Sequence, residues 1–245
     1  MALVGAILEL ADDHLVLGHR VSEWCGHAPM LEEDLAMPNI ALDLIGQSRA
    51  LYAYAGQVEG KGRDEDKLAY LRLERDYKNL LLVERPNGDF AQTMLRQFYF
   101  SVFMVLFWEK ACDSTDETLA GIAAKAVKES RYHLRHTAEW VIRLGDGTDE
   151  SHERMLKASE ALGPFIGELF ESDAVTIAAA DAGYIPFPAD LRDAWTAEVT
   201  DICAQGTFEP KLDSYAQTGG RNGQHTEDMG FLLAELQYLQ RTYPN

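Results

Sequence analysis

The amino-acid sequence predicts an all-α protein, a bundle of four long helices with additional peripheral helices. Apolar residues recur at helical spacing along most of the chain, and no window alternates between apolar and polar residues as a half-buried strand would. Strong stop signals at Pro29, Gly60-Lys61-Gly62 and Gly145-Asp146-Gly147 separate the long periodic segments. With 245 residues the chain can bury a sizeable core, and we expect a single helical domain over residues 1–245.

The first two long helices are expected at Leu3–His27 and Leu31–Glu59. The first has apolar residues on two sides, which predicts burial on both. The second contains Pro38, so we expect either a kink or a short first segment. A charged helix at Asp64–Leu80 follows, and Val83–Asp89 has the composition of a turn that ends in a helix cap.

The other two long helices are expected at Asp89–Cys112, the most apolar of the four, and from a cap at Ser114–Glu117 to Leu144. The remaining segments are a helix from Thr148 to Phe170, a loop at Ala174–Pro188, a helix at Asp190–Ala204, a flexible turn at Thr218–Gly223 and a final amphipathic helix at Thr226–Leu239. The pattern contains no internal repeat.

The chain is strongly acidic, and this limits its partners. It has 22 Lys and Arg against 40 Asp and Glu, a formal net charge of −18. Such a surface repels phosphate groups, so nucleic acid and anionic membranes are poor partners. A basic protein surface fits better, and plain solubility is the simpler explanation of the same charge.

Neither membrane insertion nor a disulfide framework is expected. The longest apolar run, Phe98–Trp108, is too short to span a bilayer, and acidic residues follow the N-terminus at once, unlike a signal peptide. Cys25, Cys112 and Cys203 are odd in number and widely spaced, which favours a reduced, cytoplasmic protein.

Projection of the four long helices places a set of polar residues inward or at the helix seams. The set comprises Glu23 with His19, Asp43 and Gln47, Gln97 and Ser101, and Ser130 and His133. A di-iron centre in a helical bundle needs about four carboxylates and two imidazoles. This layer offers at most two carboxylates and one well-placed imidazole, so we expect no di-iron site.

Two interpretations of the polar layer stay open. Glu23, Asp43 and His133 can form a mononuclear three-ligand metal site, or Glu23 or Asp43 can pair with His133 in a hydrogen-bonded cluster without metal. Other histidines are weaker candidates. His136 points away from His133, and His27 is expected to be exposed. Asp149-x-x-His152 lies at a helix start, where we expect Asp149 to be a capping residue. Gly219-Gly220 with Arg221 and His225 either grips an anion or forms a flexible turn.

Several motifs spread over the whole chain resemble those of the C-subunit family of bacterial phenylacetyl-CoA epoxidases (phenylacetate-CoA oxygenases). They are His14–Arg20, Glu23–Pro29, Leu42–Gln47, Asn79–Glu84 with Pro86-Asn87-Gly88, Lys128–Arg135, Gly219-Gly220-Arg221 with His225-Thr226-Glu227, and Ala234–Arg241. The resemblance implies a ferritin-like fold and a structural role beside a catalytic A subunit. That partner holds the di-iron centre and epoxidises the aromatic ring of phenylacetyl-CoA with oxygen.

The resemblance also implies further components and a comparison of ligand positions. The oxygenase is completed by a small B subunit, and a reductase delivers electrons from NADPH. The ligand positions of the catalytic subunit fall on Glu23, Leu44, Gln47, Ser101, Ser130 and His133, with Asp43 as an alternative to Leu44. Only Glu23 and His133 keep a ligand residue type, so no catalytic residue, metal or other cofactor is expected in this chain.

Three functions are therefore weighed. The leading one is a non-catalytic subunit that binds and stabilises the catalytic subunit over an interface of ~2,000 Å² or more. The others are an active mononuclear metal oxygenase using Glu23, Asp43 and His133, and a small-molecule carrier with an apolar cavity. The sequence leaves open whether the chain forms a homodimer when alone. For the leading function, we expect Glu23→Gln or His133→Ala to lower stability and leave turnover of the intact complex unchanged.

Overall fold

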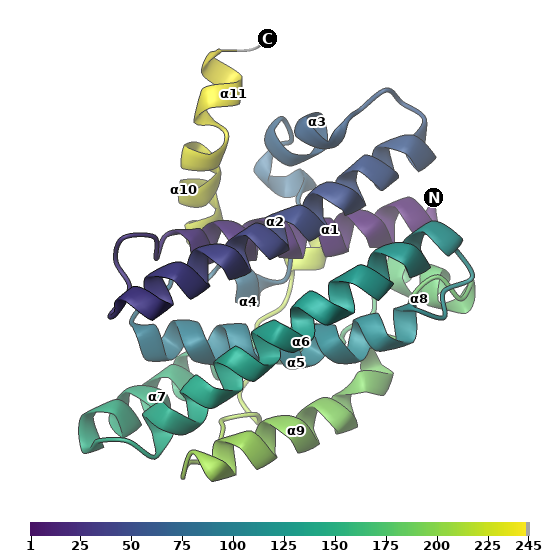
Figure 1. Cartoon of the computed structure of the whole chain (residues 1–245). Helices are drawn as coiled ribbons and strands as arrows, with labels where there is room; N and C mark the ends of the chain where they lie inside the picture. The colour runs from purple at the N-terminus through teal and green to yellow at the C-terminus, as the bar shows by residue number, and fades with distance from the viewer. Residues whose placement is uncertain (244–245) are drawn as a thin grey trace. The chain divides into compact units, whose positions relative to one another are not determined.

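The computed structural model describes residues 1–243, which contain eleven α-helices, short 3-10 segments and no strand (Figure 1). The predicted all-α class is confirmed, and the helix content is that of a ferritin-like helical bundle. The chain divides into two compact units, Met1–Pro86 together with the segment from Thr218 onward, and Asn87–Gln217. The expectation of one domain over residues 1–245 stays a prediction.

In the first unit, helix α1 (Ala2–Ser22) packs against helix α2 (Leu31–Glu59). Nearly every residue of α1 from Ala6 to Val21 is buried, which confirms the predicted burial on both sides. The predicted extension of α1 to His27 is wrong. Residues 23–27 form turns, and Gly26 has a φ of +78°, which ends the helical path. Helix α2 has the predicted bounds and continues through Pro38.

The segment predicted as one helix at Asp64–Leu80 consists of short pieces instead. It contains helix α3 (Glu65–Tyr70) and a 3-10 turn (Glu74–Asp76), with non-helical residues after each. Helix α4 (Leu81–Glu84) follows and includes Val83 and Glu84, so the turn predicted from Val83 begins later than expected. The amides of Lys78 and Leu80 each donate to an aspartate of α1 at 2.7 Å. Because these side chains accept the bonds that a helix would satisfy internally, the backbone stays extended here.

The C-terminal segment of the first unit contains helices α10 (Glu227–Leu236) and α11 (Tyr238–Thr242). The single helix predicted over Thr226–Leu239 is interrupted at Gln237, whose side-chain amide donates to the Arg72 carbonyl and the Tyr77 hydroxyl, both at 2.9 Å. Helix α10 contacts α4 and the 3-10 turn at Glu74–Asp76.

In the second unit, α5 (Phe90–Ala111) packs against α6 (Glu117–Gly145), and α7 (Asp149–Leu162) and α9 (Arg192–Gln205) pack against both. Helix α5 is almost entirely buried, as its apolar composition predicts. Side chains cap the two long helices. Asp89 accepts from the Gln92 amide at 3.0 Å and Asp116 from the Leu119 amide at 2.8 Å.

Two predictions for the second unit are wrong. The helix expected to reach Phe170 ends at Leu162, because Gly163-Pro164 cannot continue it and two 3-10 turns (Gly163–Phe165 and Gly167–Phe170) follow. The loop expected at Ala174–Pro188 contains helix α8 (Ala174–Asp181), whose alanine-rich sequence is capped by Asp173. A 3-10 turn (Pro188–Leu191) leads into α9.

No helix within residues 1–243 is long and apolar enough to cross a bilayer.

Candidate functional site

Five of the six predicted ligand positions are buried. Exposure is 1–3% for Leu44 and Gln47 on α2, Ser101 on α5, and Ser130 and His133 on α6. In each helix that provides two positions, the two residues are three apart and share one buried face. The predicted inward projection of these side chains is therefore confirmed.

Glu23 is the exception, and its predicted inward position is wrong. Helix α1 ends at Ser22, so Glu23 occupies the C-cap position, with 44% of its side chain exposed. Its carboxylate accepts a hydrogen bond from Arg20 Nη1 at 2.9 Å. Asp43 on α2 is only half-buried as well. The two carboxylates of the predicted layer thus lie toward solvent.

The buried polar groups of the second unit form hydrogen bonds of their own. Gln97 Nε2 donates to Ser101 Oγ on α5 at 3.3 Å, and the Thr137 hydroxyl donates to the His133 carbonyl on α6 at 2.8 Å. The His133 ring lies edge-on to Tyr132, with the ring centroids 6.1 Å apart. Gln97 Oε1 is buried without a hydrogen-bond partner in the described part of the chain, so this polar layer is only partly satisfied.

The residues at the six positions do not fit a di-iron centre. Leu44 has no donor atom, and Gln47, Ser101 and Ser130 supply only neutral oxygen or nitrogen. Two iron ions need several carboxylates for charge neutralisation and bridging. Within residues 1–243, no three His, Cys, Asp or Glu side chains are grouped so that they can hold a metal ion.

The other candidate histidines have structural roles. His152 Nδ1 lies 2.7 Å from the Gly145 carbonyl, so this ring caps the C-terminus of α6. Thr148, and not Asp149, is the N-cap of α7. His27 is exposed, as predicted, with Nδ1 3.0 Å from the Cys25 carbonyl.

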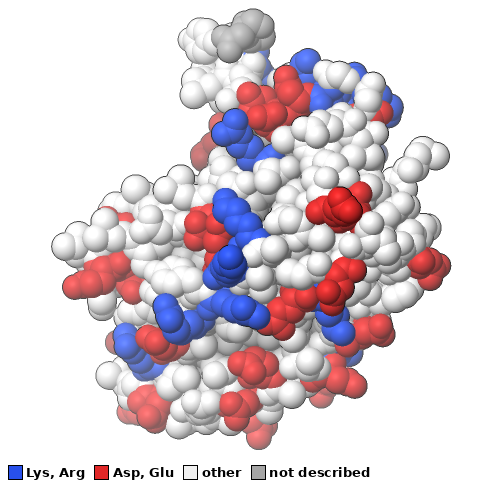
Figure 2. All heavy atoms as spheres, turned by 45° about the vertical axis from the view of Figure 1, so that its right-hand side comes forward, with Lys and Arg blue, Asp and Glu red and all other residues white. Residues whose placement is uncertain are grey.

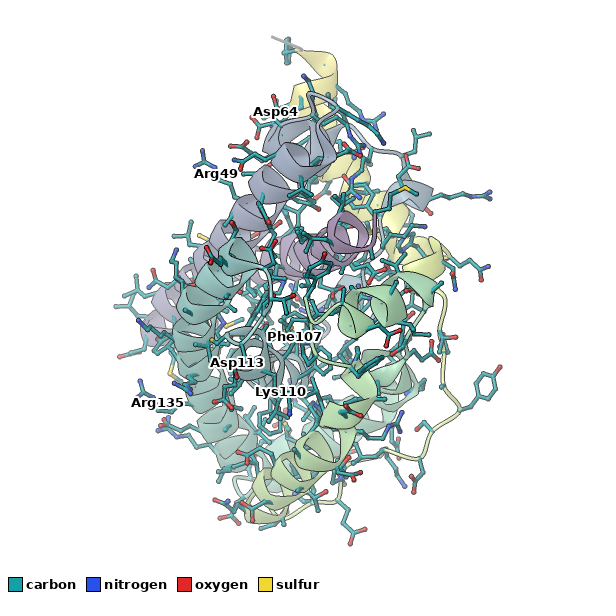
Figure 3. All side chains as sticks on the ribbon, turned by 90° about the vertical axis from the view of Figure 1, so that its right-hand side faces the viewer. Arg49, Asp64, Phe107, Lys110, Asp113 and Arg135 are labelled. Carbon is teal, nitrogen blue, oxygen red and sulfur yellow. The ribbon has the colours of Figure 1, made fainter. Side chains whose placement is uncertain are left out.

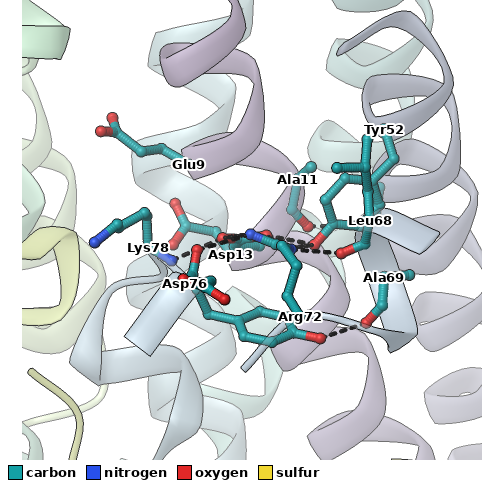
Figure 4. Close-up of polar contacts among 12 residues, drawn as sticks. Glu9, Ala11, Asp13, Tyr52, Leu68, Ala69, Arg72, Asp76 and Lys78 are labelled. Atoms are coloured by element: carbon teal, nitrogen blue, oxygen red, sulfur yellow. Dashed lines mark hydrogen bonds and ion pairs between the residues drawn. The ribbon is translucent and has the colours of Figure 1, made fainter. Parts of the chain in front are cut away.

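The most extensive polar cluster in the first unit lies elsewhere, around two adjacent aspartates in the middle of α1. Asp12 is fully buried and accepts hydrogen bonds from the Arg72 guanidinium, the Tyr52 hydroxyl and the Lys78 amide. Figure 4 labels the three residues that donate these bonds. Arg72 Nη2 also donates to the Tyr52 hydroxyl at 2.9 Å. The Asp12 carboxylate therefore ties α1 to α2 and to the segment after α3.

Asp13 binds the C-terminal segment. Arg221 donates from Nη1 and Nη2 to the two carboxylate oxygens of Asp13 at 3.0 and 2.8 Å, and its Nη1 also donates to the Lys78 carbonyl at 2.6 Å. Burial raises the pKa of Asp13 to about 6, against the opposing effect of Arg221 and of the Leu80 amide. The predicted flexible turn at Thr218–Gly223 is thus held to α1 by a bidentate ion pair.

Glu84 and His225 form the third part of the cluster. Glu84 is fully buried and accepts from Asn79 Nδ2 at 2.9 Å, from the Thr226 amide at 2.6 Å and from His225 Nδ1 at 2.8 Å. His225 Nε2 lies 3.0 Å from the Tyr77 carbonyl. Burial lowers the pKa of His225, but the hydrogen bond and charge of Glu84 outweigh it, and the pKa is raised. With acceptors at both ring nitrogens, the imidazolium form is favoured.

This buried cluster, formed by Asp12, Asp13, Tyr52, Arg72, Asn79, Glu84, Arg221 and His225, was missed by the helical projection. One signal was available in the sequence. Asp12 and Asp13 lie in the centre of a helix that is apolar on two sides, and a buried charge needs a partner. The cluster also explains why Asn79–Glu84, Gly219-Gly220-Arg221 and His225-Thr226-Glu227 stand out as motifs, since they supply its groups. Arg221 holds Asp13, an anion of the same chain.

One surface of α2 presents apolar side chains to solvent. We call Leu31, Leu35, Pro38, Leu42 and Ile45 the α2 apolar face. These residues follow one another at intervals of four, three, four and three, the repeat that places side chains along one seam of a helix. Leu31, Leu35 and Leu42 are 70%, 61% and 66% exposed. Pro38 and Ile45 are half-buried. Exposed apolar side chains aligned along one helix are typical of an interaction surface.

Fold and site together define an all-α protein of the ferritin-like type whose long helices bury polar side chains, among them Gln47, Ser101, Ser130 and His133. The chain belongs to the phenylacetic acid catabolic protein family, whose model matches residues 1–245. It is 48% identical over 242 residues to the C subunit of 1,2-phenylacetyl-CoA epoxidase from Escherichia coli strain K12, covering 99% of this chain and 97% of that protein. The resemblance drawn from the motifs is confirmed, and it places the chain in phenylacetate catabolism.

Proposed function

We propose that this chain is a non-catalytic structural subunit of a multicomponent di-iron monooxygenase that epoxidises the ring of phenylacetyl-CoA. In this role it binds and stabilises the catalytic A subunit, which holds the iron. A small B subunit and a reductase that uses NADPH complete the assembly. The similarity to the C subunit of such an epoxidase supports the assignment to an epoxidase complex.

The observation that carries the non-catalytic role is the donor chemistry of the buried layer. Leu44, Gln47, Ser101 and Ser130 are all buried and none has a carboxylate. The remaining acidic position, Glu23, is exposed and bonded to Arg20. A chain with this set of donors cannot neutralise two iron ions. Its contribution to the reaction is then made through its surface.

The α2 apolar face supports the proposed binding of the catalytic subunit. Permanent complexes bury more than ~2,000 Å² and have more apolar interfaces than transient ones. Exposed leucines at the spacing of a helix–helix seam suit a helix of another subunit. In the absence of that subunit, the same face offers a surface on which two copies of this chain would form a homodimer.

The proposal is tested by co-expression of this chain with the candidate catalytic subunit. We expect the two chains to form a stable complex that contains iron, and this chain purified alone to contain none. We also expect the catalytic subunit to be less stable and less active without this chain. Stoichiometric, chelator-resistant iron in the isolated chain would support the mononuclear oxygenase with Glu23, Asp43 and His133 instead. A ligand-filled internal cavity would support the carrier function.

The docking face is tested with the double variant Leu35→Glu and Leu42→Glu. We expect it to fold normally, because both side chains are exposed, and to lose co-purification with the catalytic subunit. Leu73→Glu is the matched control, since Leu73 is 66% exposed but lies outside the stripe. Undiminished co-purification of the double variant would exclude this face as the docking site.

A further inference from the structure

One face of α6 is basic, although the chain as a whole has a net charge of −18. Between residues 125 and 135 the sequence contains the cations Lys125, Lys128, Arg131 and Arg135 and one carboxylate, Glu129. All four cationic residues are exposed. In Figure 2, blue Lys and Arg side chains lie interspersed with red Asp and Glu side chains on the surface in view. We call these four residues, together with Tyr132, the α6 basic face.

The basic face lies on the side of α6 opposite to its buried residues. Lys125, Lys128, Tyr132 and Arg135 follow one another at intervals of three or four residues and span about 15 Å of the helix. Ser130, which is 3% exposed, lies on the other side of the helix. Because one helix carries all these residues, their arrangement is fixed by helix geometry alone.

Two of the four cations of the basic face form no ion pair within the described part of the chain. Lys125 pairs with Glu129 at 3.4 Å, and Arg131 pairs with Glu109 of α5 at 2.7 Å. Neither Lys128 nor Arg135 forms an ion pair with any residue of the described part of the chain. Figure 3 shows Arg135 pointing outward from the ribbon, whereas Phe107 lies among packed side chains. Two cations therefore stay available to an external acid.

Aromatic contacts order the side chains of Tyr132 and Arg135. Tyr132 lies between Lys128 and Arg135 and is 40% exposed. The Arg135 guanidinium carbon lies 5.8 Å from the Tyr132 ring centroid, and His136 stacks on the same ring with the centroids 6.2 Å apart. Tyr and Arg are among the residue types enriched at the energetic centres of protein interfaces. An ordered Tyr–Arg pair also loses little conformational entropy on binding.

We propose that the α6 basic face docks an acidic, carboxylate-rich surface of another polypeptide of the same oxygenase complex. This inference rests on the proposed function, and it concerns residues of the second unit, whereas the α2 apolar face belongs to the first. A solvent-exposed helix face lacks the concavity of a small-molecule site. The net charge of the chain disfavours nucleic acid, because the surrounding acidic surface repels a phosphate backbone. An acidic protein surface of limited extent can contact these cations without lying close to the acidic side chains elsewhere on this chain.

The experiment compares wild type with the double variant Lys128→Glu and Arg135→Glu, each assembled with the co-expressed catalytic subunit. Binding of the catalytic subunit, the small subunit and the reductase is measured separately at ionic strengths from ~0.05 to ~0.5 M. We expect at least one component to bind the double variant about tenfold or more weakly at low ionic strength. The difference should shrink as salt screens the charges.

Arg154→Glu with Lys157→Glu is the matched control, since both residues are exposed on α7 and each pairs with a glutamate of its own helix. We expect this control to bind every component as wild type does. Equal binding of wild type and the α6 variant, or an equal loss in the control, would overturn the inference. So would tight binding of a DNA duplex to wild type. If wild type fails to assemble with the catalytic subunit at all, the proposed function itself is wrong, which is a different result.

Discussion

Arg221 and Asp13, 208 positions apart in the sequence, form a bidentate ion pair that holds the C-terminal segment to the middle of α1. The pair is largely removed from water, with 1% of the Asp13 side chain and 17% of the Arg221 side chain exposed. Because a buried charge without its partner is strongly unfavourable, segments distant in the sequence are required together for folding of this unit.

Replacement of Arg221 by Met should lower the free energy of unfolding by ~3–5 kcal/mol, because Asp13 is left buried without its cation. Arg143→Met is the control. Arg143 pairs with Glu139 in an exposed ion pair, and we expect a loss below ~1 kcal/mol. Chemical denaturation measures both. The double variant Asp13→Asn with Arg221→Met should recover part of the loss, and no recovery would mean that packing, and not charge, is the cause.

The pair of His225 and Glu84 should make stability depend on pH. The raised pKa of His225 means that the folded state holds its proton more tightly than the unfolded state. The stabilisation is fully present below pH ~6.5 and is lost as the pH rises through the folded-state pKa. We expect the stability difference between wild type and His225→Gln to be largest near pH 6 and to shrink by pH 9. Thermal unfolding over this range measures it, and a constant difference would contradict an ionised pair.

His19 should act in the opposite direction. Burial lowers the pKa of His19 from 6.5 to about 4, because the ring is removed from water. The unfolded state then binds more protons than the folded state between these values, so wild type loses stability as the pH falls from 6.5 to 4. At pH 5 the loss from this group is ~2 kcal/mol. We expect His19→Leu to reduce the decline between pH 7 and 5, and titration of the His19 ring by NMR checks the shift directly.

The sequence predicted the periodic parts of the molecule and failed where tertiary contacts replaced local signals. Helices α2, α5 and α6 match their predicted bounds within two residues, because long amphipathic segments with clear caps fix their own ends. The helix expected at Asp64–Leu80 does not form as one element, because carboxylates of α1 accept hydrogen bonds from its backbone amides. No local pattern contains that contact.

The candidate site divides in the same way. His133 and Gln47 face inward as their positions on long helices predict, whereas Glu23 does not, because it lies one residue past the end of α1. The pairing of Asp13 with Arg221 joins opposite ends of the chain and depends on how the C-terminal segment folds back. Helical periodicity predicts that Asp13 needs a partner but cannot say which cation supplies it.

Two glycines of α6 should respond oppositely to alanine. A Cβ at Gly145 would lie 2.2 Å from the Gly206 carbonyl oxygen, so Gly145→Ala forces backbone apart and should cost ~1–3 kcal/mol or more. Gly121 lies in the same helix, and a Cβ there would meet no atom within 4 Å. Gly121→Ala should therefore stabilise the protein by up to ~1 kcal/mol. Thermal unfolding of both variants gives the comparison, and destabilisation by Gly121→Ala would contradict it.

Glu23 and His133 are the two positions that keep a metal-ligand residue type. Variants at these two positions should differ in their effect on stability, and neither should change turnover. Glu23 is exposed in an ion pair with Arg20, so Glu23→Gln should lower the free energy of unfolding by less than ~1 kcal/mol. This loss is smaller than an inward position of Glu23 would give. His133 is 1% exposed, and His133→Ala should cost ~2 kcal/mol or more through lost packing and hydrogen bonding.

Turnover per intact complex should be unchanged by either variant, because in the proposed function neither residue holds iron or touches substrate. The measurement pairs unfolding of the isolated chain with an epoxidation assay normalised to assembled complex. His133→Gln serves as the milder control, since it keeps a polar side chain in the buried layer. A large loss of turnover in a fully assembled His133 variant would show that this helix takes part in the reaction, and the non-catalytic role would have to be abandoned.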